Sequence, residues 1–199
     1  MNLSPALRVA SQGLVAAGVL AAGVALGAVA ERSLLRGRSA TVLDDAGEAF
    51  GELRGGEVSV PAADGSALHV EIDEPDAEST SGLTVIFCHG YALNLDSWHY
   101  QRRALRGRAR LVFYDQRSHG RSQHSEFDTH HIDQLGVDLG TVIDAVAPAG
   151  PLVLVGHSMG GKTAMSMCED RLAGAETLSA LVLCSTSSRR ESPCPRWAY

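Results

Sequence analysis

Cysteine is scarce in this sequence, and the spacing of its cysteines excludes two structural roles. The four cysteines form no CxxC pair and no zinc-binding pattern, and they are too few for a disulfide scaffold: Cys88, Cys168, Cys184 and Cys194. Cys88 and Cys184 lie inside apolar runs, so we interpret them as small buried hydrophobic residues. The sequence also has no internal repeat, so we do not expect a repeat architecture.

Basic residues are in deficit as well. The 199 residues contain 17 Lys and Arg against 23 Asp and Glu, a net charge of -6. The deficit lies after position 40, since residues 1–40 carry a net +3 and residues 41–199 a net -9. Proteins that bind nucleic acids rely on neutralising phosphate charge, so we expect no nucleic-acid partner. With 45% hydrophobic residues, the composition is that of a folded chain with one domain and at most a short appendage.

Charge is absent from the 22 residues between Val9 and Ala30. As a helix, this segment would extend over roughly 33 Å, which is enough to cross the hydrocarbon core of a bilayer. Three arginines follow it within residues 31–38, whereas only Arg8 precedes it. The positive-inside rule then predicts that the following domain stays in the cytoplasm. We therefore predict a single-pass N-terminal membrane anchor at residues 9–30.

Two alternatives stay open for this segment. Ala28-Val29-Ala30 matches an A-x-A cleavage site, which would make the segment a signal peptide and the protein secreted. The other alternative is a helix that packs on the domain or on a partner. In each case residues 1–38 form a separate hydrophobic segment with a basic flank, and the small, acidic residues 39–56 are predicted to be a linker.

Strand patterns begin after the linker. Glu57–Val60 and Ala67–Ile72 alternate apolar and polar residues on either side of Asp64-Gly65, which is typical of a β-hairpin. Short apolar runs then predict four more strands, the first three of them buried on both faces: Leu83–Cys88, Ala109–Tyr114, Leu152–Val155 and Ala180–Cys184.

Helical segments are predicted between these strands. They cover Ser97–Leu105, Asp133–Val146, where apolar residues recur at helical spacing, and Met159 to about Leu172. A hairpin followed by alternating strands and helices predicts an α/β fold, with helices on both faces of a mostly parallel sheet.

The pentapeptide Gly156-His157-Ser158-Met159-Gly160 has the pattern G-x-S-x-G and lies between a predicted strand and a predicted helix. A tight strand-to-helix turn would project the Ser158 hydroxyl into a cleft, where it can act as a nucleophile. Gly156 and Gly160 lack a Cβ atom and so permit the bend, with His157 as a further supporting residue. The N–H of Met159, at the helix N-terminus, becomes a candidate oxyanion donor. The alternative is a glycine-rich helix start without chemistry.

A second segment, His89-Gly90-Tyr91, follows the predicted strand Leu83–Cys88. A loop at the carboxyl end of that strand would face the pentapeptide across the crevice of the sheet. The N–H of Tyr91 is therefore the second candidate oxyanion donor. For the His89 side chain we favour a hydrogen bond to the backbone over a catalytic role.

Three segments occur in a fixed order: TVIFCHG (84–90), YDQRSHGRS (114–122) and LVGHSMGG (154–161). Together they resemble the α/β-hydrolase superfamily, in its esterase, lipase and acyltransferase-like branch, over roughly residues 55–186. The resemblance implies the α/β-hydrolase fold and hydrolysis of small ester-like acyl substrates by a serine nucleophile. Ser118 stands where the family usually carries glycine. Serine in the pentapeptide argues against the epoxide-hydrolase and haloalkane-dehalogenase branches, which use aspartate there.

The YDQRSHGRS segment is expected to be a polar turn that braces the site, and we disfavour Asp115 and His119 as a catalytic pair. We expect no cofactor and no metal. A metal site made by His130 and His131 with a neighbouring aspartate is disfavoured, because adjacent histidines on a helix point to different faces.

The triad of this family follows the chain order Ser, then Asp or Glu, then His. None of the eight histidines follows Ser158, and the only later aspartate is Asp170, within the predicted helix. The resemblance therefore implies a truncated member with a partial hydrolase domain at 57–186 and an irregular tail at 187–199. The tail is interpreted as unrelated to the fold, with a genuine short tail as the alternative. Two functions stay open: a serine hydrolase whose acid and base are missing from this chain, or a catalytically inactive, membrane-tethered binding or interaction protein.

Overall fold

The computed structural model describes residues 47–79, 82–147, 149–171 and 178–187. The chain divides into two compact units, Met1–Gly47 and Glu48–Tyr199, so every helix and strand described below lies in the second unit. The predicted anchor at residues 9–30 lies outside the described residues, as does all but the first residue of the predicted tail. No helix in the described part of the chain is long and apolar enough to cross a membrane.

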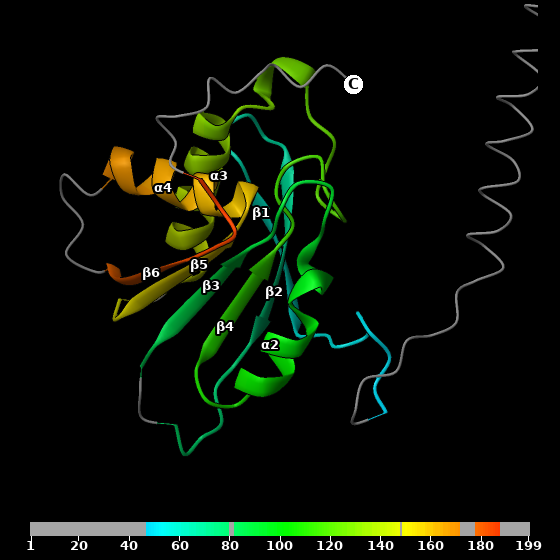
Figure 1. The fold of residues 1–199 in the computed structure, drawn as a ribbon, viewed down its shortest axis with the longest axis vertical. Helices are drawn as coiled ribbons and strands as arrows, with labels where there is room; N and C mark the ends of the chain where they lie inside the picture. Colours follow the sequence, from blue (N-terminus) through cyan, green and yellow to red (C-terminus); the bar gives the residue numbers. More distant parts are fainter. Residues whose placement is uncertain (1–46, 80–81, 148, 172–177, 188–199) are drawn as a thin grey trace, which may run out of the picture. The chain divides into compact units, whose positions relative to one another are not determined.

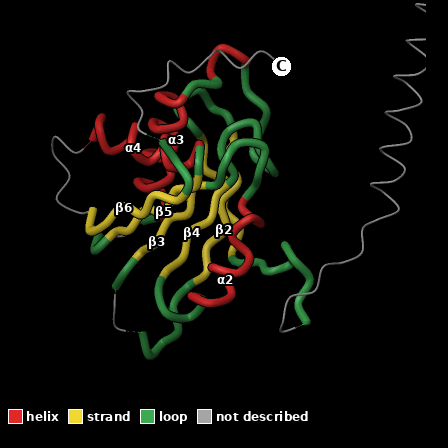
Figure 2. The backbone as a smooth tube through the Cα atoms, viewed as in Figure 1, coloured by secondary structure: helices red, strands yellow, loops and turns green. Residues whose placement is uncertain are grey.

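The described residues form one six-stranded sheet in the order β1-β2-β4-β3-β5-β6 (Figures 1 and 2). Strands β1, β2 and β4 pair antiparallel, whereas β4, β3, β5 and β6 are parallel to one another. The sheet therefore starts with an antiparallel hairpin and continues as a parallel sheet, as predicted. The strands are β1 (Gly56–Pro61), β2 (Ala67–Asp73), β3 (Thr84–Cys88), β4 (Arg110–Tyr114), β5 (Leu152–His157) and β6 (Leu178–Cys184).

Helices cover both faces of this sheet, as Figure 2 shows. Helices α3 and α4 pack against each other on one face, where their apolar side chains join those of the strands. The 3-10 helix η1 contacts β3 and β4 from the other face and continues into α2. The helical elements are η1 (Leu95–Trp98), α2 (His99–Leu105), η2 (Phe127–Thr129), α3 (Ile132–Val146) and α4 (Met159–Arg171).

Strand β3 contributes to both hydrophobic cores, because successive side chains point to opposite faces. Ile86 and Cys88 face the aliphatic core beneath α3 and α4. Phe87 faces the other core, where its ring stacks on Phe113 with centroids 4.7 Å apart. Cys88 is fully buried, as predicted, and burial raises the pKa of its thiol to about 12, so it stays protonated. The prediction for Cys184 is wrong, since this residue is only half-buried on β6, an edge strand of the described sheet.

A buried ion-pair network joins α2 to β2. The guanidinium of Arg102, 3% exposed, donates two hydrogen bonds of 2.8 Å to Asp73 and one of 2.6 Å to Glu71. Burial acts to raise the pKa of Glu71, but hydrogen bonds and positive charge from Arg102, together with a hydrogen bond from Arg121, outweigh it and hold the pKa below its usual value. Two buried carboxylates thus share one buried cation, with the more exposed Arg106 and Arg121 as further partners, an arrangement that the alternation pattern of β2 does not reveal.

Arg102→Met is expected to lower the free energy of unfolding by about 3–5 kcal/mol, because it leaves buried carboxylates without their main counter-charge. Arg103→Met is the matched control: this neighbouring arginine lies over the ring of Tyr100 and its loss should cost about 1 kcal/mol or less. Chemical denaturation measures both. Equal losses for the two variants would contradict the role assigned to the Arg102 network.

Candidate active site

The residue Ser158 occupies a sharp turn between β5 and α4. Its φ of 51° lies in the left-handed region, which a non-glycine residue adopts only when its surroundings enforce it. The surroundings do so through its backbone. The N–H of Ser158 donates to the carbonyl of Cys184 over 2.9 Å, and the carbonyl of Ser158 accepts the hydroxyl of Thr186 over 2.7 Å. The residues at the end of β6 therefore fix the turn that the G-x-S-x-G pattern predicts.

Glycine is required on both sides of Ser158. A Cβ atom on Gly156 would lie 2.6 Å from the carbonyl oxygen of Gly160. A Cβ atom on Gly160 would collide with the carbonyl oxygen of Cys88 and lie 2.6 Å from that of His89. The start of α4 therefore lies directly against the end of β3.

The loop His89-Gly90-Tyr91 lies beside the turn, as the sequence predicts. A Cβ atom on Gly90 would lie 2.8 Å from Nδ1 of His157. This position is at the carboxyl ends of β3 and β5, which are neighbours in the sheet although β4 comes between them in the chain. In open α/β sheets, such a reversal of strand order creates the crevice where ligands bind.

The side chain of His89 is fully buried and hydrogen-bonded to backbone at both nitrogens. Its Nδ1 donates to the carbonyl of Gly90 over 2.8 Å, and its Nε2 accepts the N–H of Gln116 over 3.0 Å. This arrangement requires the neutral ring, and burial lowers the pKa of His89 to about 4. The prediction that His89 supports the backbone of the loop is confirmed.

Gln116 connects three parts of the site, a role that was not predicted from the sequence. Its side-chain amide donates to the carbonyl of His89 over 2.6 Å, and its amide oxygen accepts the hydroxyl of Thr163 over 2.7 Å. The Thr163 hydroxyl also lies 3.2 Å from the carbonyl of Met159. One buried side chain thus joins the loop after β3, the loop after β4 and the first turn of α4. The expectation of a bracing polar turn holds, but its partners become visible only in the folded chain.

Asp115 and His119 do not pair with each other. The Asp115 carboxylate accepts the N–H groups of Leu95 and Arg121, each over 2.8 Å. Nδ1 of His119 donates to the carbonyl of Arg117 over 2.9 Å. Asp115 therefore holds two loops together, which is a structural role.

The departure at Ser118 has a structural counterpart. Its φ is 61°, the left-handed conformation that favours glycine. Its hydroxyl lies 2.8 Å from Nε2 of His130, and it accepts the N–H of Ser125 over 3.1 Å. These two hydrogen bonds accompany the strained backbone at this position.

A cavity of about 480 Å³ lies beside the first residue of α4, Met159, and Ser158 itself is not among the residues that line it. Tyr91 and Met159, the two residues whose N–H groups are candidate oxyanion donors, both line it. Ser158 is half-buried between β5 and α4. In the described residues, no histidine is hydrogen-bonded to the Ser158 hydroxyl, so the turn has a nucleophile candidate and donor candidates without a base.

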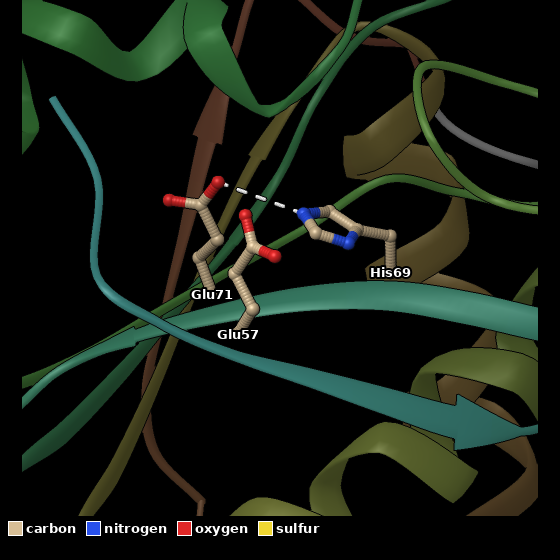
Figure 3. A group of neighbouring side chains, drawn as sticks. All are labelled: Glu57, His69 and Glu71. Carbon is tan, nitrogen blue, oxygen red and sulfur yellow. Dashed lines mark ion pairs between the residues drawn. The ribbon is translucent and has the colours of Figure 1, made fainter. Parts of the chain in front are cut away.

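Residues of the kinds that bind metal ions are grouped away from the turn at Ser158. Among the described residues, one set of three places its ligand atoms within 4.8 Å of one another: Glu57, His69 and Glu71 (Figure 3). His69 Nε2 lies 3.5 Å from Glu71, but Glu71 also accepts hydrogen bonds from Arg102 and Arg121. These guanidinium groups already supply the positive charge that a cation would bring, so this set is an ion-pair network.

The side chains of His130 and His131, the disfavoured metal site, also have other partners. Nε2 of His130 lies 2.8 Å from the Ser118 hydroxyl. Nδ1 of His131 accepts the N–H of Gln134 over 3.2 Å, where it caps the start of α3. The two rings are engaged in different local contacts.

Comparison with known proteins agrees with this geometry. The sequence model of the alpha/beta hydrolase fold family matches residues 84–198. A protein of Caulobacter sp. (strain K31) with the name "Putative carbamate hydrolase RutD" is 33% identical over 106 residues, which cover 53% of this chain and 38% of that protein. The sn-1-specific diacylglycerol lipase ABHD11 of Danio rerio is 31% identical over 115 residues, covering 57% of this chain and 34% of the lipase.

Solved structures give the same result. A thermophilic esterase from Thermogutta terrifontis superposes with a TM-score of 0.58 and 28% identity, covering 70% of this chain and 48% of the esterase. With 38% of the Caulobacter protein and 34% of the lipase covered, the chain spans little more than a third of the length of these curated relatives.

The buried, neutral His89 predicts a pH dependence of stability. Below pH 6.5 the unfolded chain binds a proton at His89, whereas the folded chain does not until about pH 4. The free energy of unfolding should therefore fall as the pH drops from 6.5 to about 4, by up to about 1.4 kcal/mol per pH unit. His89→Gln should remove this part of the slope, measured by denaturant titration at several pH values. His124→Gln, at an exposed position, is the control; an unchanged slope in His89→Gln would refute the assignment.

Proposed function

Since the chain belongs to the alpha/beta hydrolase fold family, we propose that it carries the nucleophile of a serine hydrolase that acts on small ester-like acyl substrates. Ser158 is the nucleophile, and the N–H groups of Tyr91 and Met159 bind the oxyanion. The observation that carries the proposal is the position of Ser158: a left-handed turn packed against the loop at residues 89–91. Relatives named as hydrolase, lipase and esterase support the reaction class.

The proposed reaction starts with attack of the Ser158 hydroxyl oxygen on the acyl carbon of the ester. The C–O bond to the serine forms, the carbonyl electrons move to the oxygen, and that oxyanion accepts hydrogen bonds from the two backbone N–H groups. Collapse expels the alcohol and leaves an acyl-serine, which water then hydrolyses. Gln116 and His89 act as positioning residues, because they fix the loop that carries one donor relative to the helix that carries the other.

The proton of the Ser158 hydroxyl needs a base, and the residues that the structure describes place no hydrogen-bonded histidine there. All eight histidines precede Ser158 in the sequence, and those of the described residues are not hydrogen-bonded to its hydroxyl. General-base catalysis contributes about 10²–10⁴-fold to rate, so this chain alone should react slowly. The whole reaction then requires a base from residues other than these histidines.

A second candidate function follows from the same observation. Without a base, the fold could serve as a binding or interaction module, which the uncharged segment 9–30 would tether to a membrane with the domain on the cytoplasmic side. The cavity beside the turn would then bind a ligand without turnover.

A fluorophosphonate probe distinguishes the two candidates. We expect slow labelling of the wild-type chain that free imidazole, as a substitute base, accelerates at least about tenfold. Ser158→Ala should abolish the labelling, measured by mass spectrometry of the intact protein. Ser185→Ala is the matched control, because Ser185 is an exposed serine that also has a positive φ, of 47°. Labelling that survives in Ser158→Ala would refute the nucleophile, and its absence even with imidazole would favour the binding module.

A further inference from the structure

The cavity beside Ser158 has an uneven chemical lining. One part of the wall is apolar and consists of Ala92, Phe127, Ile132, Leu135 and Met159. The volume of the cavity, about 480 Å³, lies in the range of small-molecule sites. Another part carries the nitrogen-bearing side chains of Arg117, His119, His124, His130 and His131, and the hydroxyl-bearing residues Tyr91 and Ser118 complete the lining. No carboxylate lines the cavity.

The charged neighbours of this cavity do not reverse its character. The guanidinium of Arg117 pairs with Asp138, over 2.6 Å and 2.8 Å, and with Asp64 over 2.8 Å. These two aspartates neutralise Arg117 from behind, and neither lines the cavity. Three further carboxylates in the surrounding segment are exposed and also lie outside the lining: Glu126, Asp128 and Asp133.

The histidines of the wall lie close enough to affect one another. Burial lowers the pKa of His130, a hydrogen bond with the backbone of Ser125 acts to raise it, and electrostatic interactions with Arg117, His119 and His124 act to lower it. Nδ1 of His119 donates to the backbone carbonyl of Arg117. An anion in this cavity would accept hydrogen bonds from ring N–H groups of these histidines.

We propose that this cavity receives the acyl part of an ester that carries a carboxylate at its far end, such as the half-ester of a dicarboxylic acid. The apolar wall contacts the methylene chain, while the imidazoles of His119 and His124 bind the carboxylate. This assignment rests on the proposed function, since it takes the cavity beside Ser158 as the acyl site. It adds a preference for anionic acyl groups.

The test compares two esters with the same carbon skeleton, monomethyl adipate and dimethyl adipate. Binding to the full chain carrying Ser158→Ala is measured by isothermal titration calorimetry at pH 6. We expect the half-ester to bind about tenfold more tightly than the diester. Adding His119→Gln and His124→Gln together should abolish the preference at pH 6.

His69→Gln is the matched control, because His69 lies in the ion-pair network with Glu71 and not in the cavity wall. It should leave the preference unchanged. Equal binding of the two esters at pH 6, no binding of either, or a preference that survives the double histidine change would overturn the proposal. Fluorophosphonate labelling reports on Ser158 separately. Labelling without a half-ester preference would refute the cavity assignment alone, and a preference without labelling would refute the nucleophile alone.

Discussion

The contact between Gly160 and the backbone of Cys88 and His89 determines the arrangement of the whole site. Any side chain on Gly160 would collide with the carbonyl oxygen of Cys88, so the first turn of α4 can reach the end of β3 only through glycine. This contact sets the separation between the loop that carries Tyr91 and the helix start that carries Met159. Stabilisation of an oxyanion requires two donors at fixed positions, and close packing of backbone against backbone supplies that rigidity.

Buried polar groups then hold the loops in register. His89, Gln116 and Asp115 are each almost completely buried, and each hydrogen-bonds to backbone groups of another segment. Such groups add little net stability, but a misplaced loop would leave them unsatisfied at a considerable cost in free energy. The free-energy penalty for misplaced loops therefore specifies the site more than the net stability gained from its hydrogen bonds. Ion pairs act in the same way on neighbouring elements: Arg102 holds α2 against β2, and Arg117 holds the loop after β4 against α3.

Much of this fold can be predicted from the sequence, because its signals are local. Apolar runs such as Leu152–Val155 and the alternation in Ala67–Ile72 predict strands, which the structure contains as β5 and β2 with slightly longer bounds. The turn at Ser158 follows from two glycines placed between a strand and a helix. These features depend on neighbours in the chain, which a sequence displays directly.

The features that escaped prediction depend on residues distant in the chain. The link from Gln116 to Thr163 joins positions 47 residues apart, and that from Arg102 to Asp73 joins positions 29 apart. The antiparallel pairing of β2 with β4 and the partial exposure of Cys184 follow from strand order, which composition does not encode. The cavity likewise unites histidines from the loop after β4 with residues of α3 and α4.

In the proposed function, Ser158 and the two backbone N–H groups form one site. A crystal structure of the chain after reaction with a fluorophosphonate tests this arrangement most directly. We expect the phosphoryl oxygen on Ser158 to lie about 2.7–3.1 Å from the backbone nitrogens of both Tyr91 and Met159. A phosphoryl oxygen that points to solvent, with neither nitrogen in range, would contradict it.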